Sequence, residues 1–157
     1  KAAVKAMRHP NKKFKVNGKI TYLFDPDLID GSLLCYLPCG TTLTYPQARI
    51  SGDEEITALK ANWTPGADDK EWPRYTLWHG LLAENVTQAG CASILRRSLA
   101  FSDQIVMHVH DELVLEVPEN IAHDVSPRLQ KFMETPPPWA KGLPLKAVPT
   151  TVTRYGK

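Results

Sequence analysis

The stretch that most constrains the fold is QIVMHVHDELVLEVP, which runs from Gln104 to Pro118. Apolar residues recur at every second position on both sides of His110-Asp111, as they do along half-buried strands. Alternation sorts the side chains into two faces, with Ile105, Met107, Val109, Leu113, Leu115 and Val117 on one and His108, Val114 and Glu116 on the other. The pattern predicts a β-hairpin over residues 104–118.

The tip of this hairpin departs from the usual turn chemistry. Tight hairpins mostly turn through Asn-Gly, Asp-Gly or Gly-X, because their central residues need backbone angles that glycine adopts easily. Here the tip is His110-Asp111-Glu112, without a glycine. Such a departure from the usual turn residues, at a polar tip between two apolar strands, is where a functional site is expected. A charged turn in solvent is an equally good interpretation of the pattern alone.

Composition limits the class of protein. The chain has 157 residues, of which 43% are apolar and 23% charged, as in a globular domain with its own core. The net charge of +2 is too small to indicate nucleic acid by itself. No apolar run approaches the roughly 20 residues of a membrane span. Three cysteines, an odd number, indicate reduced thiols in a cytoplasmic setting.

Three stretches have helical patterns, namely residues 2–8, 80–100 and 119–134. The last of them repeats apolar residues at helical spacing, at Ile121, Val125, Leu129 and Met133. Further hairpins are predicted around Asn17-Gly18 and within residues 33–45, and a loop over residues 64–70. The expected fold is α+β, with antiparallel β-hairpins packed on two main helices, in a single partial domain over residues 1–157.

Lysines surround the Asn17-Gly18 turn, at Lys12, Lys13, Lys15 and Lys19. They fit two interpretations. Lysines in such a cluster can contact phosphate groups. They also protect an exposed strand edge from pairing with another chain, and this second interpretation is the more common one.

Residues 109–117, VHDELVLEV, resemble motif C of the family A (DNA polymerase I-like) DNA polymerases. Phage-type members of that family are also similar to this chain over residues 32–50, 80–95 and 139–155. The resemblance implies the C-terminal palm and fingers portion of a phage or prophage DNA polymerase, in the cytoplasm of a bacterium or a phage-infected cell. The rest of the polymerase would lie upstream of Lys1.

The resemblance also implies roles for the tip. Asp111 matches the metal ligand of motif C, Glu112 its supporting neighbour, and His110 the residue near the primer terminus. Nucleotidyl transfer uses two Mg²⁺ ions held by carboxylates, and this chain would supply one half of that site. Nothing here resembles motifs A and B, which hold the second aspartate and the incoming nucleotide. Residues 1–157 alone are therefore expected to be inactive.

The helix over residues 80–100 is the expected DNA contact. Asn85 and Gln88 fall near its apolar face, where amides either face a ligand or find partners in the protein. The family places the matching glutamine against the minor groove of primer-template DNA, which suits an amide because its donors can test base-pair geometry without reading sequence. Arg96 and Arg97 follow, as phosphate contacts or as a solvated helix end. Deoxynucleoside triphosphates would be the partners of the full-length enzyme.

Two rival functions remain open. His108, His110 and Asp111 could ligate a metal in a hydrolase, since alternate strand residues place both histidines on one face. The chain could also be a divergent or inactive DNA-binding remnant. This second rival rests on departures from the family pattern, at Thr41, Leu81 and Ser93.

Overall fold

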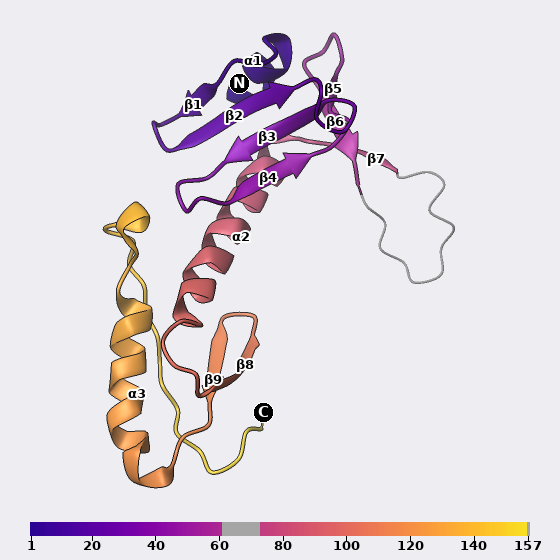
Figure 1. Ribbon diagram of the computed structural model, residues 1–157. Helices are drawn as coiled ribbons and strands as arrows, with labels where there is room; N and C mark the ends of the chain where they lie inside the picture. The colour runs from indigo at the N-terminus through magenta and orange to yellow at the C-terminus, as the bar shows by residue number, and fades with distance from the viewer. Residues whose placement is uncertain (61–72, 157) are drawn as a thin grey trace. The chain divides into compact units, whose positions relative to one another are not determined.

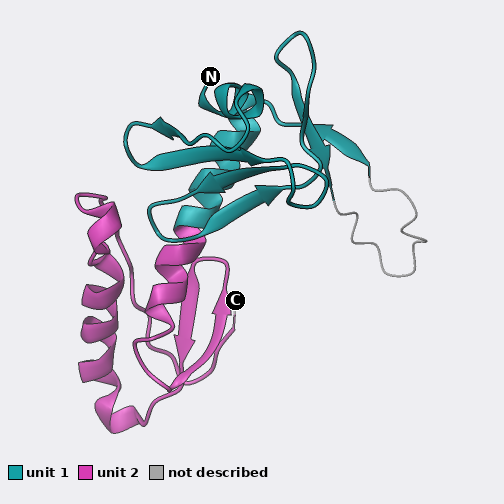
Figure 2. Cartoon of the chain, turned by 45° about the horizontal axis from the view of Figure 1, so that its top comes forward, with its two compact units in different colours: residues 1–90 teal, residues 91–157 magenta. Residues whose placement is uncertain are grey.

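The computed structural model describes residues 1–60 and 73–156 (Figure 1). Its described part contains three α-helices and antiparallel sheets, which confirms the α+β class. The predicted loop over residues 64–70 lies outside the described residues. Contacts divide the chain into two compact units, residues 1–90 and 91–157, with the boundary inside the second helix (Figure 2). The expectation of a single partial domain stays a prediction.

Unit 1 is built on a four-stranded antiparallel meander. The first helix precedes it, and a smaller sheet of three strands follows it. The elements are α1 (Ala2–Arg8), β1 (Phe14–Val16), β2 (Ile20–Asp25), β3 (Ser32–Tyr36), β4 (Thr42–Tyr45), β5 (Arg49–Ile50), β6 (Ile56–Leu59), β7 (Arg74–Thr76) and the start of α2 (His79–Ser98). Asn17 and Gly18 both have positive φ, 49° and 70°. The predicted turn therefore joins β1 to β2 through a three-residue loop, residues 17–19, whose first two residues are left-handed.

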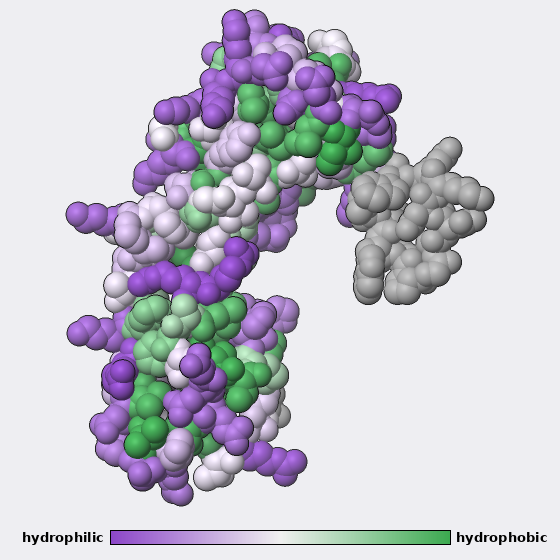
Figure 3. All heavy atoms as spheres, in the orientation of Figure 1, coloured by the Kyte–Doolittle hydropathy of each residue, from purple (hydrophilic) through white to green (hydrophobic). Residues whose placement is uncertain are grey.

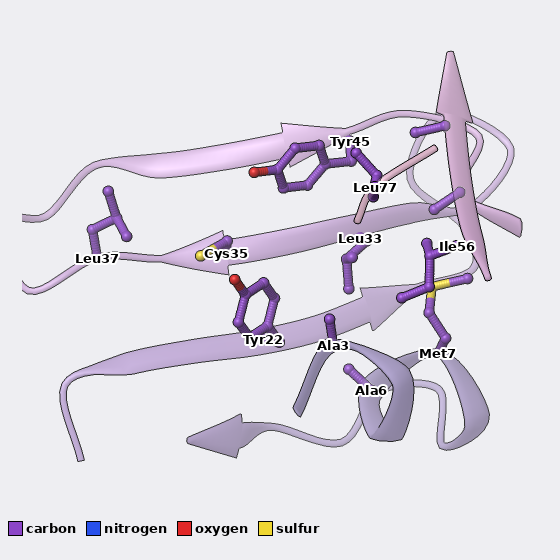
Figure 4. Packing of buried hydrophobic residues seen from close by; sticks show 12 residues of the cluster. Ala3, Ala6, Met7, Tyr22, Leu33, Cys35, Leu37, Tyr45, Ile56 and Leu77 are labelled. Carbon is purple, nitrogen blue, oxygen red and sulfur yellow. The ribbon is translucent and has the colours of Figure 1, made fainter. Parts of the chain in front are cut away.

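The core of unit 1 lies on one face of the four-stranded sheet (Figure 4). Register places Tyr22 opposite Cys35 on this face, and both are buried. Helix α1 approaches the face closely because it presents the small residues Ala3 and Ala6, of which Ala6 is fully buried. Burial raises the pKa of the Tyr22 hydroxyl and of the Cys35 thiol, so both stay protonated at neutral pH.

Unit 2 contains the end of α2, a hairpin of β8 (Ile105–Val109) and β9 (Glu112–Leu115), α3 (Glu119–Glu134) and the short 3-10 helix η1 (Pro138–Ala140). Helix α3 has the predicted bounds, 119–134. The chain after η1 is held along α3 by two side chains. Glu134 accepts hydrogen bonds from Gln130 and from the Ala147 backbone amide, at 3.1 and 3.2 Å, and Gln130 also donates to the Ala147 carbonyl. These two donated hydrogen bonds lower the pKa of Glu134.

The hairpin has the predicted location, but its faces differ from the prediction. Ile105 pairs with Leu115, whereas Met107 pairs with Val114 and His108 with Leu113, because the register shifts between Ile105 and Met107. One extra residue in β8 reverses the alternation from that point on. The prediction that Met107 and Val109 share the face of Leu113, and that His108 shares the face of Val114, is therefore wrong.

None of the helices in the described residues is long and apolar enough to cross a membrane.

Strand β3 supplies the first test of this fold. Leu33 is fully buried, whereas Leu28, in the loop before β3, is 37% exposed. Leu33→Ala should lower the free energy of unfolding by about 2–5 kcal/mol, since a cavity remains among packed neighbours. The same change at Leu28 should cost within about 0.5 kcal/mol. Urea unfolding followed by circular dichroism measures both, and equal losses would show that the core is placed wrongly.

Candidate functional site

The tip of the β8–β9 hairpin is a two-residue turn, His110-Asp111, between the paired residues Val109 and Glu112. Only one of the two central residues has a positive φ, and it is His110, at 51°. Histidine tolerates this left-handed region better than most residues other than glycine, asparagine and aspartate. Within the tip, the positive φ is therefore confined to His110, and Asp111 does not share it.

The tip presents its polar side chains to solvent. His110, Asp111 and Glu112 are all exposed, so two adjacent carboxylates and an imidazole project from the end of a short, regular scaffold. Carboxylate oxygens are the donors that Mg²⁺ prefers. The described residues contain no group of three or more histidines, cysteines or acids that could hold a metal ion. The tip thus has the donor chemistry for a hard cation, but only part of a complete ligand set.

His108 does not complete such a set. It lies in β8 opposite Leu113, and the strand ends at Val109, before His110. The regular alternation that was expected to place both histidines on one strand face therefore stops between them. The geometry gives the hydrolase hypothesis no support within the described residues.

Asn85 is joined to the core of unit 1. Its side-chain amide donates to the Tyr45 hydroxyl at 3.2 Å, and both residues belong to unit 1. Tyr45 is almost fully buried, and this burial raises its pKa to about 12 even though the bond from Asn85 acts in the opposite direction. No pattern in the sequence predicts Tyr45 as this partner, because the two residues are 40 positions apart. Asn85 thus positions α2 on the sheet, and its role toward DNA stays a prediction.

Gln88 lies nearer to solvent than the apolar face of α2. The residues of α2 that pack on the core are Leu81, Leu82, Val86 and Ala89. Gln88 is exposed and donates to Glu84 one turn earlier, at 3.0 Å. A primary amide has a second N–H and a carbonyl oxygen, so this bond leaves Gln88 able to contact a ligand. Its predicted minor-groove role is untested.

Arg97 is held within unit 2. Its guanidinium donates to the Thr135 carbonyl at 2.7 Å and lies over the Phe132 ring, 4.7 Å from the centroid. Phe101 packs on the same ring. A shallow cavity of about 320 Å³ beside them is lined by Arg97, Phe101, Arg128, Lys131, Phe132 and Thr135. Arg97 therefore fixes the end of α2 to the end of α3, whereas Arg96 is exposed. Phosphate contact by either arginine stays a prediction.

Comparison with known proteins shows that this chain is related to a phage DNA polymerase. The chain is 33% identical over 150 residues to a DNA polymerase of Bacillus phage SP02. The match covers 93% of this chain and 22% of that polymerase. No protein-family model matches, and no solved structure matches. The chain is thus related to a segment of a phage DNA polymerase and spans about a fifth of its length.

The conformation of His110 can be tested by substitution. His110→Gly should keep or raise the stability of the hairpin, because glycine adopts positive φ without steric cost. His110→Val should lower it by about 1–2 kcal/mol, because a β-branched side chain clashes in that region. Hydrogen exchange of the Glu116 amide, which donates to the Gln104 carbonyl at 3.0 Å, reports on hairpin opening. Equal protection in both variants would mean that His110 is not left-handed.

Proposed function

We propose that this chain is the C-terminal palm segment of a family A DNA polymerase of phage or prophage type. The longer enzyme extends a DNA primer on a template in the cytoplasm of a bacterium or an infected cell. One observation carries the proposal. The chain is related to a phage DNA polymerase over 93% of its length, and its hairpin has the exposed tip His110-Asp111-Glu112.

The incomplete hairpin sheet supports a longer parent protein. β8 and β9 form a sheet of only two strands in the described part of the chain, and a two-stranded hairpin is marginally stable alone. Its first strand exposes Val106 and Met107, at 59% and 36%. Hydrophobic residues are visible over this hairpin in Figure 3. Further palm strands would cover such a surface.

Asp111 is the proposed ligand of one catalytic Mg²⁺ ion, with Glu112 supporting it and His110 near the primer terminus. Bound Mg²⁺ stabilises the negative charge that develops on transferred phosphate. The remaining ligands would come from outside residues 1–157. The short strands fix where the carboxylate projects, and its exposure leaves room for a ligand set completed by another part of the polymerase.

Primer-template DNA is the proposed partner of α2. Gln88 supplies an accessible amide and Arg96 an accessible cation, while Asn85 holds the helix to the sheet through Tyr45. Amide donors match the acceptors that all base pairs present in the minor groove. Deoxynucleoside triphosphates would bind to the longer enzyme.

A second candidate is an inactive DNA-binding remnant. It is favoured by Leu81, which stands where related polymerases commonly have a lysine and which packs against the core of unit 1. A position expected to carry a cation toward DNA serves packing here. Thr41 and Ser93 are further departures from the family pattern.

A chimera separates the two candidates. Residues 1–157 replace the matching segment of the SP02 phage polymerase, and primer extension is measured with Mg²⁺ and all four nucleotides. We expect the chimera to extend the primer and residues 1–157 alone not to extend it. Asp111→Asn should lower the extension rate of the chimera by at least about a thousandfold, because a charged metal ligand is removed. Asp103→Asn is the matched control, since Asp103 is an exposed aspartate of the same unit outside the tip.

Extension that survives Asp111→Asn would remove Asp111 from the metal site. A chimera that binds primer-template DNA yet does not extend it would favour the remnant. Extension by residues 1–157 alone, lost with Asp111→Asn, would mean that the chain contains a complete site.

A further inference from the structure

A basic groove lies in unit 1, between the start of α1 and the edge strand β1. It has a volume of about 290 Å³ and is lined by Lys1, Ala2, Lys5, Phe14, Lys15, Val16 and Asn17. Three of these residues carry ammonium groups, and none of these seven carries a carboxylate. The groove therefore concentrates positive charge at a concave surface.

Local structure explains why the lysines gather there. Helix α1 buries Ala3, Ala6 and Met7 against the sheet and leaves Lys1 and Lys5, one helical turn apart, in solvent. In β1 the flanking residues Phe14 and Val16 are half-buried, whereas Lys15 between them is exposed. Strand β1 is at the edge of the sheet, beside the helix, so lysines of both elements reach the same groove.

Positive charges predominate in the N-terminal segment around the groove. Every charged side chain before Asp25 is a cation, at Lys1, Lys5, Arg8, Lys12, Lys13, Lys15 and Lys19. Arg8 is neutralised by Glu54 at 2.9 Å. The Lys13 ammonium lies 5.5 Å from the centre of the Tyr36 ring. Strand-edge protection explains Lys15, but it does not explain Lys1 and Lys5 on a helix.

We propose that this groove binds the phosphate backbone of DNA, as a contact separate from the α2 residues and the hairpin tip. Three exposed ammonium groups and the Asn17 amide suit the oxygens of phosphodiesters, whose negative charges repeat along the strand. Ala2, Phe14 and Val16, which are half-buried, complete the lining of the groove. The proposal deepens the DNA polymerase function proposed above and rests on it for the choice of DNA as the polyanion.

The test is a titration of fluorescent 20-base-pair DNA with residues 1–157 at several salt concentrations. For duplex DNA, the slope of log K against log salt falls by about 0.9 for each phosphate contact removed. Lys5→Gln/Lys15→Gln should therefore reduce the slope by about 2. The control Lys141→Gln/Lys146→Gln changes net charge equally at two exposed lysines of unit 2 and should leave the slope unchanged. Lys5→Arg/Lys15→Arg should keep the original slope.

Equal slopes in the two glutamine variants, or no DNA binding by the unmutated chain, would overturn the proposal. A parallel titration with dATP distinguishes free nucleotide phosphates from the backbone. If the groove variant loses dATP binding while its DNA slope is unchanged, the backbone assignment is wrong. The chimera tests the polymerase function independently, because loss of extension with Asp111→Asn does not depend on Lys5 or Lys15.

Discussion

Burial of strand β3 is the constraint on which unit 1 depends. Ser32, Leu33, Leu34 and Cys35 are all buried, so this strand is covered on both of its faces. Its polar atoms are satisfied locally: the Ser32 hydroxyl donates to the Leu28 carbonyl at 2.8 Å. Because β2 and β4 pair on either side of β3, its position fixes the sheet that α1 and the start of α2 cover. The basic groove and the position of Asn85 both follow from that packing.

Sequence patterns predicted those parts of the fold in which one local signal dominates. Helix α3 has its predicted bounds because a regular apolar repeat ends at consecutive prolines, and Asn17-Gly18 determines its own turn. The shift in β8 was not predictable, since a bulge changes the register without changing the residue types along the strand. The side of α2 that packs on the sheet does not follow from the pattern either, because its apolar residues surround more than one face and the sheet selects among them.

The candidate site, too, could be predicted from the sequence only in part. The sequence located the hairpin tip and its three exposed polar residues, since they interrupt an apolar pattern. It did not reveal that His110 is the one tip residue with positive φ, that Asn85 donates a hydrogen bond to Tyr45, or that Arg97 joins α2 to α3 in unit 2. Each of these depends on residues distant in sequence or on a backbone angle. Lys1 and Lys5 were missed as part of a basic surface although their spacing of four residues was visible.

The central claim is that Asp111 binds a catalytic metal ion, and a change of ligand softness tests it most directly. Asp111→Cys in the chimera replaces a hard oxygen donor by a thiolate, which binds Mg²⁺ poorly and softer cations well. The account predicts that this variant binds primer-template DNA, does not extend it with Mg²⁺, and regains extension with Mn²⁺ or Cd²⁺. Undiminished extension with Mg²⁺, or none with any of these cations while DNA binding is retained, would contradict it.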